Sequence, residues 1–340
     1  MQRKKTWLLS LTLVLLAGIL TACGGTSKAT SGADGSDKQI VIDISATTSS
    51  ASAAVKGIEK FVEELERLTD GKVTGKIYPN NQFGGEREVI EMMGTDSLDM
   101  ALASSGPMGT FVNEFNMLDL PYLFDSLEHA FAVLDGEIGQ ELSTKFEEQA
   151  NVTVLGYMDN GFRQPTNSVR AMASVDDAKG LKVRTQENEI QIDTWSAYGA
   201  NPTPIAWTET FTSLQQKVVD GQANPIDVIY DMKFQEVQDH VALLDDVYSP
   251  MVLMMSKGKL ESFSPEIQDA IKEAAKIAVP YEREVKKEMT EDYLVKLEEA
   301  GMTVTVPDKE SFKAKTDPVY DKWTKVFGAD LIDSIRNYEY

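Results

Sequence analysis

Arg184 is the side chain of this sequence best suited to binding a small anion. It stands at the end of a short predicted strand, residues 181–184, where side chains reach the cleft above the edge of a sheet. A guanidinium offers two charge-assisted hydrogen bonds in one plane, which replace the water that a carboxylate loses in a closed cleft. We therefore expect Arg184 to hold a carboxylate; the alternative is an arginine in a surface ion pair.

A second group of polar residues can contact the other end of such an anion. Glu86 opens a predicted helix after two glycines, and it either accepts hydrogen bonds from ligand hydroxyls or only complements the helix dipole. Ser104 and Ser105 end a buried strand and can line the opposite wall, or they merely end that strand. Thr48 belongs to a hydroxyl-bearing stretch, residues 45–48, which ends the first strand and points to the same cleft.

Catalysis is the competing interpretation of such a cleft. An extracellular hydrolase or lyase acting on acidic sugars needs a nucleophile with a base, and the chain has only two histidines, His129 and His240. Neither lies near a Gly-x-Ser-x-Gly elbow or near a second metal ligand at a known spacing. Paired carboxylates stay open as a catalytic device, because the chain has 54 acidic residues. We expect no enzyme activity, no cofactor and no metal site.

Alternating strands and helices must position these residues. Period-two alternation of apolar residues predicts strands, helical spacing predicts helices, and the two kinds alternate along the chain. This order is typical of an α/β architecture whose sheets are covered by helices. The predicted strands are residues 41–46, 72–78, 98–103, 152–157, 181–184 and 247–255. The predicted shorter helices are residues 50–68, 86–93, 126–148 and 188–198.

The longest predicted helix runs from Ser264 to about residue 300. Ser264 and Pro265 form a favourable helix start, and Gly301 ends the helical pattern. About 37 residues at 1.5 Å each give roughly 55 Å, more than the width of one ordinary domain. Pro280 should kink this helix. We interpret it as a strut that spans two lobes; the alternative is two helices that meet at Pro280.

The beginning of the chain is typical of an exported lipoprotein. Basic residues 3–5 precede an apolar run, residues 8–20, that is too short for a stable membrane span. Small residues then precede Cys23, the single cysteine of the chain. This pattern predicts a signal peptide over residues 1–22 and a diacylglycerol on Cys23; an ordinary signal peptide with a chance cysteine is the alternative. The small, polar residues 23–38 predict a flexible tether.

The charge of the chain excludes several classes of partner. The formal net charge is -21 at pH 7, and residues 1–22 carry basic but no acidic groups, so the remainder is more acidic still. Such a surface repels nucleic acid and, apart from the lipid anchor, anionic lipid head groups. We expect an extracytoplasmic monomer that is held at the membrane by its lipid.

Four stretches of the chain, in a fixed order, resemble one protein family. They are residues 78–86 (YPNNQFGGE), 118–124 (LDLPYLF), 179–184 (KGLKVR) and 218–225 (VVDGQANP), with 233–238 (KFQEVQ) just beyond the last. Together they are similar to the binding proteins of tripartite ATP-independent periplasmic (TRAP) transporters, over nearly everything from residue 39 onward. The binding subunit of an ATP-driven transporter, with a similar fold, is the alternative.

The resemblance implies a fold and a partner. The expected fold is the two-lobed periplasmic binding protein fold, with hinge strands and a long kinked helix across both lobes. Lobe 1 is expected over residues 39–161, completed by about 250–285, and lobe 2 over residues 162–249, completed by about 286–340. The lobes would close on a small organic acid, and the closed form would dock on an ion-driven TRAP permease.

The resemblance also implies roles for single residues. Arg184 lies where the family has the arginine that pairs with the ligand carboxylate, and Arg163 matches a second arginine near it; the alternative for Arg163 is a hinge-region salt bridge. Asn224 matches a carboxylate donor, although Asn-Pro also starts turns. Trp207 falls where relatives place an aromatic side chain against the ligand, although it could equally be a core residue at a helix start. Many relatives have Glu in place of Ala223, so one contact beside Asn224 departs from the family pattern.

The identity of the acid depends on few positions. Relatives that bind sialic acid carry a glutamate at about Ser104 and an asparagine near Ser45, and this chain has neither. Residues 184–188 and the surroundings of Trp207 are more similar to members that bind sugar acids or C4-dicarboxylates. We expect a sugar acid such as a uronate, because Glu86 would repel a second carboxylate; a C4-dicarboxylate is the alternative.

Overall fold

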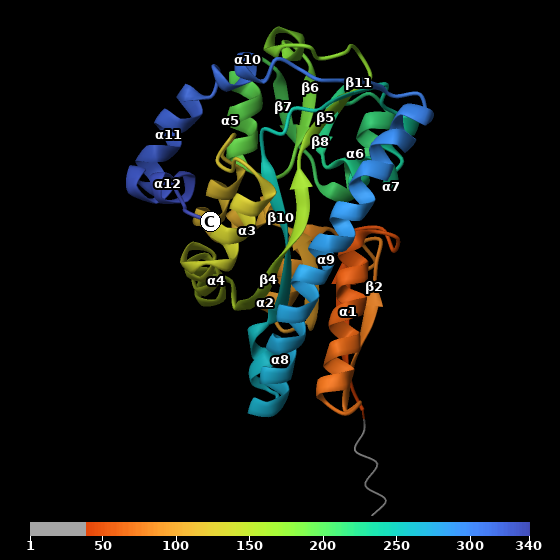
Figure 1. Ribbon diagram of the computed structural model, residues 1–340, viewed down its shortest axis with the longest axis vertical. Coiled ribbons are helices and arrows are strands. Elements are labelled where there is room, and N and C mark those ends of the chain that lie inside the picture. Colours follow the sequence, from red (N-terminus) through yellow and green to blue (C-terminus); the bar gives the residue numbers. More distant parts are fainter. Residues whose placement is uncertain (1–38) are drawn as a thin grey trace, which may run out of the picture. The chain divides into compact units, whose positions relative to one another are not determined.

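Two β-sheets organise residues 39–340, the part of the chain that the computed structural model describes (Figure 1). The first sheet has the strand order β2-β1-β3-β10-β4, and the second has the order β11-β9-β5-β8-β6-β7. The strands of the first sheet are β1 (Ile40–Ala46), β2 (Val73–Tyr78), β3 (Met100–Ser104), β4 (Val152–Phe162) and β10 (Tyr248–Ser256). Those of the second are β5 (Gln164–Asn167), β6 (Lys182–Thr185), β7 (Asn201–Pro204), β8 (Gly221–Asn224), β9 (His240–Ala242) and β11 (Thr303–Thr305). The predicted signal peptide, tether and Cys23 lie outside the described residues.

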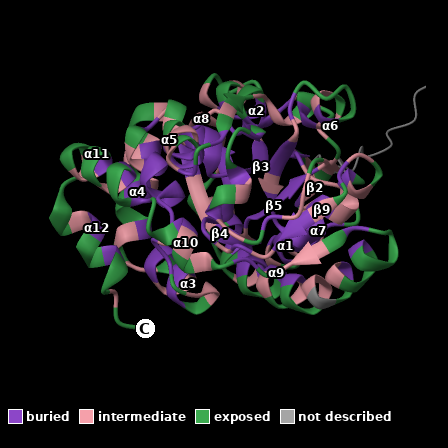
Figure 2. Cartoon of the chain, turned by 90° about the horizontal axis from the view of Figure 1, so that it is seen from above, coloured by how far each residue is buried: buried purple, intermediate pink, exposed green. Residues whose placement is uncertain are grey.

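Helices surround both sheets, and Figure 2 shows buried strands enclosed by helices whose outer faces are exposed. The α-helices are α1 (Ala53–Leu68), α2 (Glu86–Gly94), α3 (Leu127–Asp135), α4 (Glu137–Ala150), α5 (Glu189–Ala197), α6 (Trp207–Gln215), α7 (Ile226–Asp231), α8 (Lys257–Glu261), α9 (Pro265–Glu299), α10 (Lys309–Lys313), α11 (Asp317–Phe327) and α12 (Ala329–Arg336). The 3-10 helices are η1 (Gly106–Thr110), η2 (Asn113–Asp119), η3 (Val175–Ala178) and η4 (Phe234–Glu236). Within residues 39–340 no helix is both long enough and apolar enough to cross a membrane.

Strand β10 shows how the first sheet separates two hydrophobic cores. All of its residues are buried. Met251, Leu253 and Met255 pack with α1 and the beginning of α9, whereas Val252 and Met254 pack with α2, α3 and α4 on the other face. Successive strand residues point to opposite faces, so one apolar strand serves both cores.

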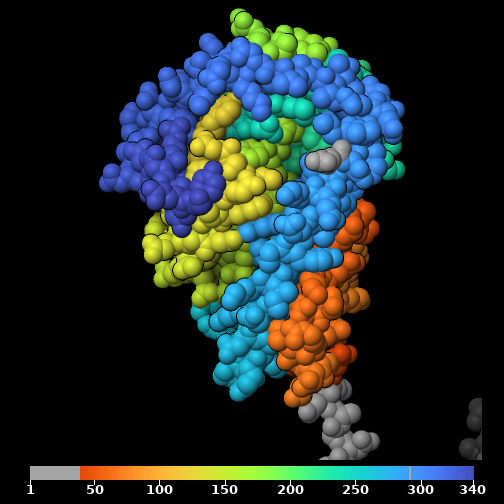
Figure 3. All heavy atoms as spheres, viewed as in Figure 1, coloured from red at the N-terminus to blue at the C-terminus, as the bar shows by residue number. Residues whose placement is uncertain are grey.

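The long helix α9 joins the two lobes. It runs through Pro280 as a single helix of 35 residues, so the predicted strut is confirmed and the alternative of two helices is wrong. Its first half packs against the first sheet through residues such as Ile271, and its second half packs against α7 through Tyr293 and Leu297. Figure 3 shows α9 at the surface alongside α1. The predicted two-lobed α/β fold is thereby confirmed.

The two lobes are also joined by the strands at their centre. Strand β4 ends at Phe162 and β5 begins at Gln164, so Arg163 marks the point where the chain enters the second sheet. Strand β10 returns to the first sheet and pairs antiparallel with β4, from Tyr248 beside Phe162 to Ser256 beside Val152. This long pairing forms the centre of the molecule, and the polar site lies at its upper end.

Two expectations about helices are wrong. The helix predicted over residues 126–148 is broken at Gly136, whose extended backbone ends α3 and begins α4. The break lets Gly139 approach the carbonyl of Leu134 so closely that an added Cβ would lie 1.8 Å from its oxygen. Helices α11 and α12, expected in lobe 2 with the rest of residues 286–340, instead bury Trp323 and Ile335 in the core formed by α2, α3 and α4, whereas Phe312 of α10 packs in the core of the second lobe. Burial of their apolar faces decides this position, which periodicity alone does not encode.

Candidate functional site

Polar residues at four strand ends meet where the two lobes face each other. Strands β1 and β3 run parallel in the first sheet, as do β6 and β8 in the second, and such strands expose their carboxyl ends at one edge. The cavity between these edges is lined by Thr47, Thr48, Glu86, Ser104, Asn160, Arg163, Gln186, Trp207, Asn224, Val228 and Met251. Six of the eight predicted ligand-binding residues therefore come together, and Arg184 and Ser105 are the two that do not line this cavity.

Arg184 is buried next to this cavity with most of its donors free. The side chain is 3 % exposed, and its Nε donates to the carbonyl of Ile205 at 2.8 Å. No acceptor among residues 39–340 contacts its Nη1 or Nη2. The guanidinium lies 5.8 Å from the ring of Trp207 and lines an adjoining cavity that Arg163 also lines. The alternative of a surface ion pair is wrong, because the side chain is buried and makes no salt bridge within the described residues.

Burial also shifts the acid–base equilibrium of Arg184. Loss of solvent, together with the neighbouring charge of Arg163, lowers the pKa of Arg184 to about 9. The guanidinium is still charged at neutral pH. A buried cation with free donors and a neighbouring cation gains strongly from an incoming anion.

Arg163 is equally buried but is already occupied by protein acceptors. Its Nε donates to Ser249 Oγ at 2.9 Å, and its Nη1 donates to the carbonyl of Ala223 at 2.7 Å and to Asn224 Oδ1 at 3.1 Å. Its Nη2 donates to Gln186 Oε1. All of these acceptors are neutral, so the predicted alternative, a salt bridge to a strand carboxylate, is wrong. Four of its five N–H groups are used by protein acceptors within residues 39–340. Arg163 therefore mainly holds neighbouring residues in place and has one N–H group left for a ligand.

Asn224 and Trp207 complete the wall that the second lobe contributes. Asn224 ends β8, and because its Oδ1 faces Arg163, its amide nitrogen is turned toward Gln222 and the cavity. Trp207 begins α6, and its indole N–H crosses the cleft to the carbonyl of Thr47 at 3.1 Å. Its ring also packs edge-on against Phe234. Trp207 thus both lines the cavity and packs as the first residue of a helix, so the two roles predicted for it do not exclude each other.

The wall from the first lobe is rich in acceptors. Glu86 is 8 % exposed, and its Oε1 accepts a hydrogen bond from the backbone N–H of Ser104 at 2.8 Å. The hydroxyl of Thr48 lies 3.0 Å from that of Ser52, beside the start of α1. Ser105 is fully buried, and its hydroxyl has no partner within residues 39–340. Glu86, Ser104 and Thr48 therefore lie on this wall, and Ser105 lies behind it.

Gln186 and Asn160 line the cavity but were not among the residues predicted from the sequence. Gln186 follows β6, two residues after Arg184, and residues two apart on a strand share a face. That spacing is the signal that could have found it. Asn160 lies within β4 and lines the cavity, but the sequence around it did not indicate that its side chain faces the ligand site.

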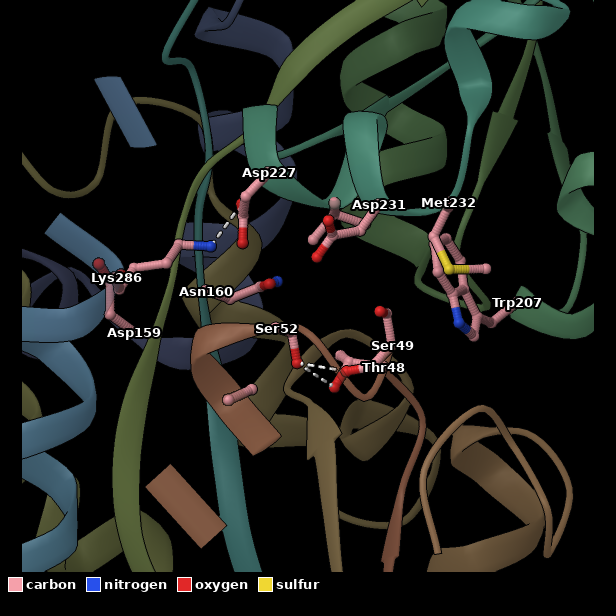
Figure 4. A pocket seen from close by; sticks show the side chains of 12 residues that line it. Thr48, Ser49, Ser52, Asp159, Asn160, Trp207, Asp227, Asp231, Met232 and Lys286 are labelled. Atoms are coloured by element: carbon pink, nitrogen blue, oxygen red, sulfur yellow. Dashed lines mark hydrogen bonds and ion pairs between the residues drawn. The ribbon is translucent and has the colours of Figure 1, made fainter. Parts of the chain in front are cut away.

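An acidic compartment adjoins this cavity and shares Thr48, Asn160, Trp207 and Val228 with it. Figure 4 shows Asp227 and Asp231 projecting into it from α7. Their neighbours include Asp159 and Lys286, and Lys286 forms a buried ion pair with Asp227 at 2.5 Å.

The carboxyls behind this compartment hold their protons unusually strongly. Glu282, on α9, is fully buried and accepts a hydrogen bond from the backbone N–H of Asp159 at 2.8 Å. Burial, and then the charge of Asp159, raise the pKa of Glu282 to about 8. Burial likewise raises the pKa of Asp159. Despite these carboxyls, no group of three potential metal ligands occurs within the described residues.

Comparison with known proteins gives one consistent family. Residues 44–326 match the model of the family described as bacterial extracellular solute-binding protein, family 7. A TRAP periplasmic solute-binding protein from Polaromonas sp. JS666, solved with bound D-erythronate, is 37% identical, with a TM-score of 0.86 over 89% of this chain and 100% of that chain.

Two curated relatives cover similar parts of the chain. The 2,3-diketo-L-gulonate-binding periplasmic protein of Escherichia coli is 33% identical over 82% of this chain and 85% of its own length. The C4-dicarboxylate-binding periplasmic protein of Rhodobacter capsulatus is 30% identical over 87% of this chain and 90% of its own. Relatives of this chain therefore bind both sugar acids and C4-dicarboxylates.

Proposed function

This chain belongs to family 7 of the bacterial extracellular solute-binding proteins, the TRAP type, and we propose that it captures a hydroxylated organic acid for an ion-gradient-driven permease. The observation that carries this proposal is the free guanidinium edge of Arg184. A buried charge without partners is costly, and a carboxylate would take two of its N–H groups at once.

The two walls of the cleft suit opposite ends of such an acid. Arg184 and Asn224, on the second lobe, supply donors for the carboxylate. Glu86 and Thr48, on the first lobe, supply acceptors for hydroxyl groups. A ligand that reaches both walls stabilises only the arrangement in which the lobes are close, and this differential contact shifts the hinge equilibrium toward closure.

Charge favours a sugar acid, such as a uronate or an aldonate, over a C4-dicarboxylate. Beyond the two arginines, the ligand meets Glu86 and then the compartment that contains Asp227 and Asp231. A second carboxylate would face these acids, whereas hydroxyl groups would donate hydrogen bonds to them. The alternative of a C4-dicarboxylate retains the support of the Rhodobacter capsulatus relative.

We further propose that the mature protein is anchored by a lipid on Cys23 and extends from the membrane on residues 24–38. The support is the pattern of basic, apolar and small residues before the single cysteine. Metabolic labelling with a fatty acid should label the protein that has Cys23 but should not label the Cys23→Ser variant. Label in the variant would contradict the anchor.

We also propose that the lobes hinge where strands cross between the sheets, at residues 161–163 and near residue 249. Arg163 and Ser249 face each other there at 2.9 Å. Hydrogen exchange that changes at these residues on ligand addition would support this position, and exchange that changes only elsewhere would contradict it.

A thermal-shift screen tests the ligand proposal. The chain from residue 24 to 340 is screened against uronates, aldonates, C4-dicarboxylates and plain monocarboxylates. A ligand at 100 times its dissociation constant adds about 2.7 kcal/mol to the free energy of unfolding. Stabilisation by dicarboxylates alone would overturn the sugar-acid proposal. Turnover of a stabilising acid would favour the hydrolase or lyase alternative.

A further inference from the structure

Gln186 connects the two walls of the cleft through its side chain. The residue follows β6 in the second lobe and is 4 % exposed. Its Nε2 donates to Ser104 Oγ at 2.7 Å and to Glu86 Oε2 at 3.2 Å, and both of these partners belong to the first lobe. Its Oε1 accepts from Arg163 Nη2 and from Gln191 Nε2, the latter at 2.9 Å.

This set of partners saturates the carboxamide of Gln186. An amide has two N–H donors and two acceptor lone pairs, and all four are used here. The two donors face the first lobe and the two acceptors face the second. The complete set exists only while Glu86 and Ser104 are held next to Arg163, so the hydrogen bonds depend on the distance between the lobes.

The chain leaves space for this side chain at Gly106. A Cβ added to Gly106 would lie 2.3 Å from Gln186 Oε1 and 2.9 Å from its Nε2. Gly106 begins η1 in the first lobe, where its backbone requires no special conformation of glycine. The close approach to Gln186 therefore gives a spatial reason for the glycine, and it offers a second way to displace the carboxamide.

We propose that Gln186 is an interlobe clasp that determines how tightly the protein holds its ligand. This inference rests on the proposed function, because it deepens the account of the same cleft. Gln186 acts as a positioning residue: it holds Glu86 of one wall and Arg163 of the other, and it leaves the ligand carboxylate to Arg184. Its bonds contribute to the closed arrangement and are lost on opening.

The thermodynamic consequence is a coupling between the clasp and affinity. The apparent dissociation constant equals the intrinsic constant divided by the fraction of protein that is competent to bind. Removal of the clasp lowers the closed fraction and also leaves buried donors and acceptors unpaired. We expect Gln186→Ala to weaken binding about 10- to 100-fold, mainly through a faster dissociation rate.

The test measures calorimetric affinity for D-erythronate and D-glucuronate in Gln186→Ala and Gly106→Ala. The second variant keeps residue 186 and displaces its carboxamide, so both should weaken binding in the same direction. The control is Gln238→Ala, since Gln238 is also buried and its bonds, to Thr166, Asp220 and Val237, stay within the second lobe. It should lower the melting temperature and leave affinity unchanged.

A third variant, Gln186→Glu, separates a clasp from a merely structural side chain. At pH 8 its ionised carboxylate would repel Glu86, whereas at pH 5 a protonated carboxyl could again donate to the first lobe and accept from Arg163. Its affinity relative to the unmodified protein should therefore recover as the pH falls. A ratio that is constant between pH 5 and pH 8 contradicts the clasp.

Small-angle X-ray scattering keeps this inference separate from the ligand proposal. In ligand-free samples, Gln186→Ala and Gly106→Ala should increase the radius of gyration, and Gln238→Ala should not. If neither acid binds the unmodified protein, the choice of ligand fails while scattering still tests the clasp. Affinities within threefold of the unmodified protein in both clasp variants, or an unchanged radius of gyration in both, would overturn it.

Discussion

Two buried polar clusters lie side by side between the lobes, and their charges are unbalanced in opposite directions. The cleft cluster consists of Glu86, Arg163 and Arg184. The hinge cluster, named for the proposed hinge at residues 161–163 nearby, consists of Asp159, Asp227, Glu282 and Lys286. The first has an excess of cations with free donors at Arg184, and the second has an excess of carboxyls around one lysine.

The difference shows how a protein can use an unbalanced buried charge. An arginine keeps its proton at neutral pH, so the cleft cluster reaches balance only when an anion enters. A buried carboxyl can instead retain a proton, and burial raises the pKa of Glu282 to about 8. The cleft cluster therefore works as a binding site, while the hinge cluster neutralises part of its charge with protons.

The largest effect is expected from removing the one lysine of the hinge cluster. Lys286→Met should lower the free energy of unfolding by about 3–5 kcal/mol at pH 7, because it leaves Asp227 buried without its partner. Urea denaturation measures the change. The matched control is Lys322→Met, whose partner Asp193 is near the surface and whose loss should cost less than about 1 kcal/mol. An equal loss of unfolding free energy in the two variants would show that the buried pair Lys286–Asp227 stabilises the fold no more than the exposed pair Lys322–Asp193 does.

Removal of Arg184 should affect binding more than folding. Arg184→Ala should weaken ligand binding by about 2–5 kcal/mol in calorimetry, because the carboxylate loses its buried partner. Its free energy of unfolding should change little or rise, since the variant removes a cation that forms no salt bridge within residues 39–340. Arg163→Ala provides the contrast and should lower stability, because Arg163 donates to four protein acceptors. Affinity that survives in Arg184→Ala would remove Arg184 from the site.

The hinge cluster should also make stability depend on pH. Because the pKa of Glu282 in the folded protein is raised, the folded state keeps a proton that the unfolded state has already released. Stability should therefore fall as pH rises from about 4.5 to about 8, by at most about 1.4 kcal/mol per pH unit. Glu282→Gln should flatten this slope and be more stable than the unmodified protein at pH 8. A slope that is identical in the variant would assign the dependence to other groups.

A conservative change in the cleft cluster should have the smallest effect. Arg184→Lys keeps the charge but loses the planar pair of donors, so affinity should fall by about 1–2 kcal/mol, less than in Arg184→Ala. Calorimetry with the same acid in both variants gives the comparison. If the two variants bind equally weakly, the geometry of the guanidinium matters and its charge contributes nothing measurable.

Much of the framework could be predicted from local pattern. The strand over residues 247–255 and the long helix from Ser264 were visible because apolar alternation, caps and periodicity are properties of neighbouring residues. The break at Gly136 was missed, although a glycine can end a helix, because the residues on both sides of it are helical. Helices α11 and α12 were assigned to the wrong lobe because an apolar helix face does not indicate which core it covers.

The candidate site was likewise predictable from the sequence only in part. The sequence by itself placed Arg184 at the end of a strand, and the resemblance to TRAP binding proteins pointed to Arg163, Asn224 and Trp207. Only the tertiary structure decided that Arg163 is occupied and Arg184 is free, because the acceptors of Arg163 come from Ser249, Ala223, Asn224 and Gln186, which lie 23 to 86 positions away along the chain. Hydrogen bonds are satisfied by neighbours in space, so the free donor that makes Arg184 a binding residue exists only in the folded protein.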